Sequence, residues 1–146
     1  MAKVPEYFFT QSGVIPYRVD AGHMEVLLIG SRKNKRWVIP KGVREPDLSA
    51  RISAAREALE EAGIEGNLAT APIGSYRYRK WGGQCKVEVF PMAVTRVHDR
   101  WPEEHRRRKW LTVDEAACRV KEKKLGKLIH RLPGHVAATR NDEHKD

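Results

Sequence analysis

The sequence has only two cysteines among 146 residues and no long hydrophobic run. Cys85 and Cys118 lie far apart and belong to no metal-ligand pattern, so we expect reduced thiols and a cytoplasmic location. Because no stretch of 18 apolar residues is present, we expect no helical membrane span. The first residues, MAKVPEYFF, lack the charged and then apolar pattern of a signal peptide. Aromatic residues are also few and form no stacking-type repeat, which argues against a dedicated single-strand nucleic-acid binder.

Positive charge is in excess, with a formal net charge of +9. An excess of lysine and arginine favours a polyanionic partner, which is a phosphorylated small molecule, RNA or DNA, and solubility alone is the alternative explanation. The length suits one domain with a proper core, and we expect residues 1–146 to form it, with a flexible tail over 135–146. Whether the chain is a monomer or a dimer is left open by the sequence.

The clearest local pattern is a helix that begins after Ser49 and ends at Gly63. Ser49 is a suitable N-cap, helix-forming residues fill the body, and glycine is a common stop. With 100° of rotation per residue, one side of this helix is apolar and predicted to be buried. That side contains Ile52, Ala55, Leu59 and Ala62.

Three glutamates, Glu57, Glu60 and Glu61, share the opposite side of the predicted helix within about one quadrant. Like charges at this spacing repel one another, and the helix dipole disfavours anions in the C-terminal half. Divalent cations would reverse the sign of this local field, and hard oxygen ligands without Cys or His suit Mg²⁺ or Mn²⁺. For the bare Glu-x-x-Glu-Glu pattern, a solvated acidic face is the alternative.

The residues around the three glutamates resemble the signature of the Nudix hydrolases, G-x5-E-x7-R-E-U-x-E-E-x-G-U, in which U is a bulky aliphatic residue. The positions that match at the correct spacing are Gly42, Arg56, Glu57, Glu60, Glu61, Gly63 and Ile64. Leu48 replaces the first glutamate, and Ala58 is small for a U position. Lys109 stands where family members often carry an acid, so the chain could recruit Glu103 or Glu104 instead.

The resemblance implies an α/β (α+β) fold, an α/β/α sandwich in which a mixed, partly curled sheet separates the acidic helix from the last helix. It also implies Mg²⁺- or Mn²⁺-dependent hydrolysis of a phosphoanhydride bond. The implied catalytic residues are Arg56, Glu57, Glu60 and Glu61. The implied metal contacts are Glu57, Glu60, Glu61 and the carbonyl of Gly42. Among these, Glu60 is the preferred general base, and Arg56 is expected to orient a glutamate.

Over about residues 8–125, the chain most resembles the diphosphoinositol polyphosphate phosphohydrolase branch, which also cleaves diadenosine polyphosphates. The stretches EVLLIGSRKNKRWVIPKG and DRWPEEHRRRKWLTVDEA carry this likeness. The implied substrate-binding residues are Ser31, Arg32, Lys33, Lys41, Arg77, Arg79, Lys80, Arg106 and Arg107. The alternatives are an RNA 5′-pyrophosphohydrolase, a nucleoside triphosphate or ADP-ribose pyrophosphatase, and a catalytically weak Nudix-fold protein that binds nucleotides or RNA.

Outside the acidic helix, apolar and alternating runs predict strands at 8–16, 25–30, 37–40, 71–79 and 85–97. Turns are predicted at 20–23, 65–67 and 80–84. A short strand begins at Trp110, and Thr112 with Glu115 predicts a capping box at the start of one final helix.

Overall fold

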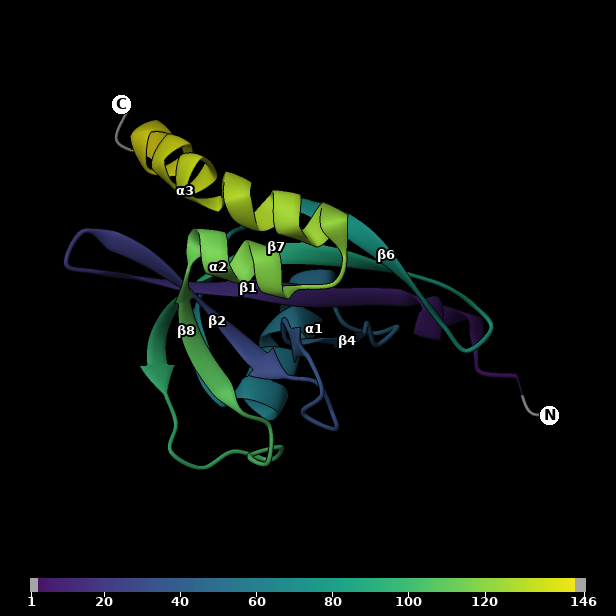
Figure 1. Cartoon of the computed structure of the whole chain (residues 1–146). Coiled ribbons are helices and arrows are strands. Elements are labelled where there is room, and N and C mark those ends of the chain that lie inside the picture. Colours follow the sequence, from purple (N-terminus) through teal and green to yellow (C-terminus); the bar gives the residue numbers. More distant parts are fainter. Residues whose placement is uncertain (1–2, 144–146) are drawn as a thin grey trace.

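The computed structural model describes residues 3–143, and over these residues the chain forms a mixed, open sheet of eight strands between two layers of helices. One layer contains α1 (Ala50–Glu57) and the π-helical turn η2 (Ala58–Ala62). The other contains α2 (Val113–Arg119) and α3 (Lys123–Glu143), which cover the opposite face (Figure 1). This arrangement confirms the predicted α/β/α fold class.

The sheet has the order β3-β2-β1-β7-β5, with β4 paired to β1, β6 to β7 and β8 to β2. The strands β1 and β7 are parallel, and the other pairs are antiparallel. The bounds are β1 (Thr10–Asp20), β2 (His23–Gly30), β3 (Trp37–Val38), β4 (Lys41–Val43), β5 (Ile64–Leu68), β6 (Gly74–Lys80), β7 (Gly83–Val97) and β8 (Arg108–Thr112), and a short helix η1 (Glu6–Phe9) precedes β1.

The central strands supply two separate cores, one on each face of the sheet. Val14 and Leu27 pack with the α1 layer, whereas the neighbouring Ile15 and Leu28 pack with the α2 and α3 layer. Successive side chains of a strand point to opposite faces, so a strand covered on both sides has apolar residues at every position. This explains the uninterrupted apolar run in β2.

The predicted helix termini are confirmed. The hydroxyl of Ser49 accepts a hydrogen bond from the Ile52 amide at 3.1 Å, and Gly63 ends the helical segment with a φ of 65°. Thr112 and Glu115 form the expected capping box at the start of α2. These contacts satisfy backbone groups that the ends of a helix otherwise leave unpaired.

The predicted buried side of the acidic helix is only partly right, because Ala62 is buried and Ala55 packs against the core but the two largest residues are exposed. Ile52 and Leu59 are 51% and 39% exposed, whereas the side that contacts the sheet is built from small residues. Those residues recur at every fourth position and are Ala50, Ala54, Ala58 and Ala62. Alanine allows the helix backbone to approach the sheet closely, and a larger side chain at these positions would overpack the contact. The prediction was based on hydrophobicity alone, which favours Ile52 and Leu59 over alanine as buried residues.

The C-terminal part also differs from the prediction, because two helices replace the single final helix. Val120, with an extended backbone, separates α2 from α3. The segment expected to be a flexible tail is helical from residue 135 as far as Glu143, and Val136 packs against the core. Residues 144–146 lie outside the described part. None of the described helices is long and apolar enough to cross a membrane.

The predicted turn at 65–67 is wrong as well, because these residues belong to β5. This strand pairs antiparallel with β7 from Ile64 to Leu68, with a register shift between Glu65 and Gly66. The polar residues at 65–67 have a weak strand propensity and therefore suggested a turn. Pairing with β7 outweighs this propensity and makes the segment a strand.

The alanine contact can be tested by two substitutions on neighbouring faces of α1. Ala54→Leu should lower the free energy of unfolding by about 1–3 kcal/mol, because it adds volume to a packed interface. Ile52→Ala should change it by less than about 0.5 kcal/mol, because the side chain is exposed. Urea unfolding of both variants measures these changes, and a larger loss for Ile52→Ala would contradict the observed packing.

Candidate active site

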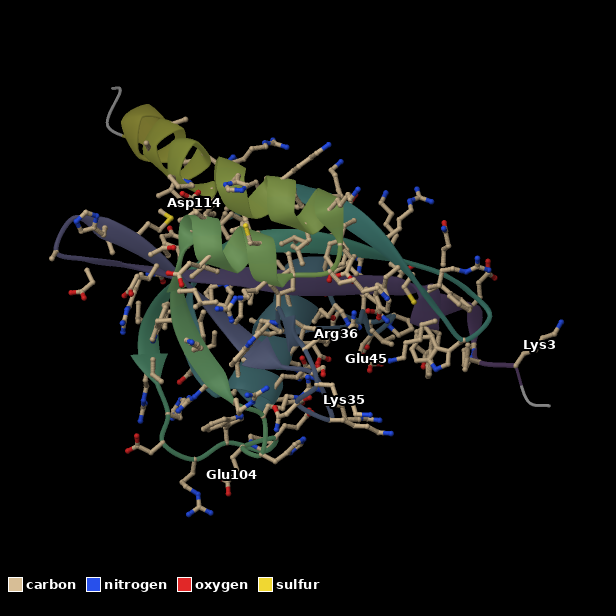
Figure 2. The ribbon with its side chains drawn as sticks, viewed as in Figure 1. Lys3, Lys35, Arg36, Glu45, Glu104 and Asp114 are labelled. Carbon is tan, nitrogen blue, oxygen red and sulfur yellow. The ribbon has the colours of Figure 1, made fainter. Side chains whose placement is uncertain are left out.

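A basic cleft of about 860 Å³ lies where the loop after β2, β4, the α1–η2 segment and the β6–β7 turn come together. Its volume is within the range of small-molecule binding sites. Basic side chains outnumber acidic ones around it, and Lys35, Arg36 and Glu45, labelled in Figure 2, are among the residues that line it. The cleft therefore suits an anionic ligand.

Two of the three predicted glutamates meet in this cleft. Glu57 and Glu61 both line the cleft beside Gly42 of β4, and the charge of Glu61 acts on the Glu57 carboxyl group. A Cβ atom at position 42 would overlap the Glu57 carboxyl group. Glycine at this position therefore lets the Glu57 carboxyl group lie directly against the backbone of β4.

Burial changes the acidity of both carboxyl groups. It raises the pKa of Glu57 to about 8, and the neighbouring charges of Glu61 and Glu60 act in the same direction. Burial also raises the pKa of Glu61, although Arg106 and the backbone amide of Lys41, 3.3 Å from Glu61 Oε1, oppose this shift. At neutral pH, the pair therefore holds a proton where no cation is bound.

Glu60 does not join the pair in this structure, although the sequence placed all three glutamates together. Its side chain is exposed and is not among those that line the cleft. The reason is the π-helical turn η2, in which hydrogen bonds join residues five positions apart and widen the turn. The wider turn keeps Glu57 beside Glu61 and directs Glu60 outward.

Arg56 is exposed at the end of α1. In the described part of the chain, no hydrogen bond or ion pair joins it to a glutamate, so its predicted orienting role stays a prediction. Leu48 and Lys109, which stand where family members often carry an acid, lie elsewhere: Lys109 is exposed on β8, and the carbonyl of Leu48 accepts a hydrogen bond from Arg44 at 3.2 Å.

Most of the predicted substrate-binding residues line the cleft. Those that do are Ser31, Arg32, Lys33, Lys41, Arg79, Lys80 and Arg106. Two do not. Arg77 is exposed on β6, and Arg107 packs over the Trp37 ring at 4.8 Å and donates to the Asn34 carbonyl at 2.7 Å. Arg107 thus stabilises the loop after β2 by these contacts and does not line the cleft.

Arg106 is held by acids instead of projecting freely. It is only 8% exposed, with Nη2 3.0 Å from Glu103 Oε1 and Nη1 3.8 Å from Glu61 Oε1. Of the two acids that the chain could recruit, the structure thus brings Glu103 to the cleft. Glu104 is directed away and pairs with Arg100 at 2.7 Å.

The oxygen donors at the cleft floor fit a hard divalent cation. Glu57, Glu61 and the Gly42 carbonyl offer oxygen ligands only, which suits Mg²⁺ or Mn²⁺ better than softer metals. The approach that Gly42 permits brings the Glu57 carboxyl group against the backbone of β4, and Glu61 lines the same cleft. Within the described residues, no three His, Cys, Asp or Glu side chains converge on one point, so the backbone carbonyl and water would have to complete the ligand set.

The family is decided by sequence. The sequence model described as NUDIX domain matches residues 10–132. The chain belongs to the Nudix family. Nudix hydrolase 12, mitochondrial, of Arabidopsis thaliana is 38% identical over 127 residues, which are 72% of this chain. The chain spans only 63% of the length of that relative.

Two further comparisons support the branch and the fold of this Nudix domain. Diphosphoinositol polyphosphate phosphohydrolase 3-beta of Bos taurus is 27% identical over 129 residues, which cover 86% of this chain and 76% of that protein. The crystal structure of a C. elegans Ap4A hydrolase binary complex matches with a TM-score of 0.77 and 24% identity, covering 88% of this chain and 98% of that one. The structural likeness confirms the Nudix fold.

The Nudix cleft also contains Gln11, Tyr78 and Trp81, which the sequence did not single out. Lys41 Nζ lies 3.3 Å from the hydroxyl of Tyr78, which donates to Gln11 Oε1 at 2.6 Å. Burial lowers the pKa of Lys41. Trp81 lies at the rim beside Lys80. The alternation of tyrosines in β6 was visible in the sequence, but its position beside β4 depends on long-range strand pairing.

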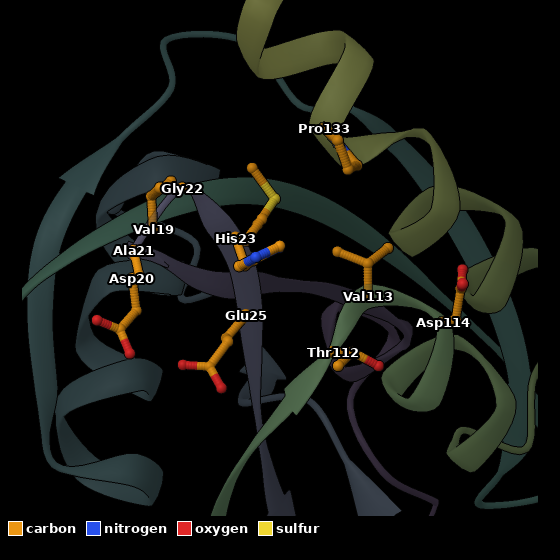
Figure 3. A pocket seen from close by; sticks show the side chains of 11 residues that line it. Val19, Asp20, Ala21, Gly22, His23, Glu25, Thr112, Val113, Asp114 and Pro133 are labelled. Carbon is orange, nitrogen blue, oxygen red and sulfur yellow. The ribbon is translucent and has the colours of Figure 1, made fainter.

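A second hollow, of about 650 Å³, lies at the β1–β2 turn against the start of α2 and Pro133 of α3 (Figure 3). Asp20, Glu25 and Asp114 are among its lining residues, and none of the predicted site residues is. Its acidic lining does not suit a polyphosphate. The basic cleft is therefore the candidate active site of this Nudix domain.

The raised pKa of Glu57 predicts a pH-dependent stability of the metal-free protein. Between about pH 4.5, the ordinary value, and pH 8, unfolded Glu57 binds fewer protons than folded Glu57. Stability should therefore fall as the pH rises through this range. Urea unfolding in a chelator should show the fall, and Glu57→Gln should flatten it. The same slope in wild type and Glu57→Gln would contradict the assignment, with Glu104→Gln as the charge-matched control.

Proposed function

We propose that this Nudix domain is a divalent-metal-dependent hydrolase that cleaves a phosphoanhydride bond in a nucleoside- or inositol-linked polyphosphate, of the diadenosine polyphosphate or diphosphoinositol polyphosphate type. Membership of the Nudix hydrolase family supports a pyrophosphate hydrolase. The observation that carries the proposal is the pair of half-buried Glu57 and buried Glu61 beside Gly42, in a cleft with a basic lining.

The carboxylates of Glu57 and Glu61 and the carbonyl of Gly42 would hold the cation. A bound Mg²⁺ or Mn²⁺ neutralises phosphate charge, lowers the pKa of water and stabilises the leaving group. The Glu57–Glu61 pair must lose its proton before it can bind a cation. Arg106 would then be freed in part from Glu61, 3.8 Å away, and could face the phosphates.

Glu60 is retained in the proposal as the general base. Catalytic contacts often form only in the complex with substrate, so an exposed side chain in the free protein does not rule the residue out. Glu60 follows Glu57 by three positions, and its charge is close enough to raise the pKa of Glu57. A base at this position would take a proton from water on the outer side of the pair.

The basic lining would bind the phosphate chain. Arg32, Lys33 and Arg79 are exposed cations that reach the cleft from two sides. The loop that carries Arg32 and Lys33 is held in shape by Ser31, whose hydroxyl accepts from the amides of residues 35 and 36 at 3.2 and 3.3 Å. A rigid loop holds its charges in place at a lower entropic cost on binding.

The prediction of a cytoplasmic location remains a proposal. Cys85 is buried and Cys118 is exposed, and both are free thiols, which agrees with a reducing compartment. The names of some relatives place those proteins in mitochondria.

Three substitutions separate metal binding from proton transfer. Glu57→Gln and Glu61→Gln should weaken Mg²⁺ binding, measured by calorimetry, and lower turnover of diadenosine tetraphosphate at least about a hundredfold, since both would remove a metal ligand. Glu60→Gln should lower turnover at least about a hundredfold, the low end of general-base effects, without changing the affinity for Mg²⁺. Release of phosphorylated products measures turnover.

Glu104→Gln is the matched control, because it removes the same charge from an exposed residue outside the cleft. It should retain wild-type turnover. If all three cleft variants also retained it, the carboxylates would not be the catalytic site. A loss of Mg²⁺ affinity in Glu60→Gln would move that residue from base to ligand.

A further inference from the structure

A tryptophan on the β6–β7 hairpin is exposed beside the cleft that contains the metal donors. Trp81 is 39% exposed and lines the cleft that also contains Glu57 and Glu61. It stands at the tip of the β6–β7 hairpin, in which Lys80 pairs with Gly83 and only Trp81 and Gly82 connect the strands.

The backbone at this tip has a conformation that bulky residues rarely adopt. The φ angles of Trp81 and Gly82 are 55° and 75°, so both central residues have the positive φ that a type I′ turn requires. Asparagine and glycine fill these positions most readily, whereas tryptophan is strained there. Strain at an exposed residue of a binding cleft points to a function for the side chain.

Neighbouring aromatic rings hold the indole in place. Its ring centroid lies 5.3 Å from that of Phe8 and 6.0 Å from that of Phe9, and the latter ring meets it nearly edge-on. Both phenylalanines belong to η1, which lies beside the hairpin tip (Figure 1). Lys80 Nζ lies 4.5 Å from the indole centroid. The ring is thus fixed by apolar contacts and keeps an exposed part next to basic side chains.

We infer that Trp81 is a stacking platform for a nucleobase, and that the cleft therefore takes a nucleoside polyphosphate in preference to an inositol polyphosphate. This inference rests on the proposed function, because it assigns the non-phosphate part of the same substrate. Every nucleobase has a flat π face that stacks on an aromatic side chain, whereas an inositol ring has none. The base would replace the Lys80 ammonium on the ring, which leaves that cation free for a phosphate.

The test compares two non-hydrolysable probes in the presence of Mg²⁺: α,β-methylene-ADP and methylenediphosphonate, which lacks the nucleoside. Trp81→Asn removes the ring and creates the Asn-Gly turn that this backbone favours, so the fold should be retained. The variant should bind α,β-methylene-ADP about 5- to 150-fold more weakly, the range for the loss of one base stack. Its affinity for methylenediphosphonate should equal that of the wild type, and Trp81→Phe should lie in between.

Tyr7→Ala is the matched control, because Tyr7 has the same 39% exposure in η1 but does not line the cleft. It should leave both affinities unchanged. Equal affinity of wild type and Trp81→Asn for α,β-methylene-ADP would overturn the inference, and so would an equal loss for both probes. If the wild type hydrolysed no polyphosphate with Mg²⁺, the proposed function itself would fail. If the wild type hydrolysed polyphosphates but Trp81→Asn kept the wild-type ratio of affinities for the two probes, only the stacking role of Trp81 would be contradicted.

Discussion

The close contact between the acidic helical segment and the sheet determines the position of the active-site carboxylates. Four small residues, spaced four apart from Ala50 to Ala62, bring the helical backbone against the α1 face of the sheet. Gly42 completes the approach, because any side chain there would overlap the Glu57 carboxyl group. A polar site is therefore built by apolar packing on one side and by the absence of a side chain on the other.

This geometry has an electrostatic cost. In general, two unit charges of the same sign about 4 Å apart repel by about 4 kcal/mol at an effective dielectric of 20. Two neighbouring ionised carboxylates are therefore costly even before burial adds to the repulsion. The free protein lowers this cost by keeping a proton on the pair, as the raised pKa of Glu57 shows, and by directing Arg106 toward Glu61. A divalent cation would do the same with two positive charges. The site is thus arranged so that one form of charge compensation can replace another.

The sequence predicted those features that depend on local chemistry. The caps at Ser49 and Thr112, the stop at Gly63 and the turns at 20–23 and 80–84 need only neighbouring residues, and the signature spacing identified Gly42 and the glutamates. It could not predict which side of α1 is buried, because the hydrophobic scale favours Ile52 over Ala54 while the sheet requires a small residue. The π turn that separates Glu60 from Glu61 also leaves no mark in the periodicity.

The rest of the cleft depends on long-range pairing. Tyr78 and Trp81 reach the site only because β6 pairs with β7, which pairs with β1, which carries β4 on its other side. Glu103 reaches it through the loop before β8, where Glu103 and Glu104 look alike in sequence but face opposite ways. The sequence predicted the basic character of the cleft better than the role of each basic residue. Arg107 contacts the loop after β2, whereas Arg106 pairs with Glu103 and lies near Glu61.

The central claim is that the Glu57–Glu61 pair holds a proton which a metal ion displaces. Calorimetric titration of the protein with Mg²⁺ at pH 7, repeated in buffers of different ionisation enthalpy, measures the protons released per ion bound. The account predicts saturable binding whose heat depends on the buffer, with about one proton released, and the loss of that dependence in Glu57→Gln. Binding with no buffer dependence, or no binding with and without a diphosphate analogue, would contradict it.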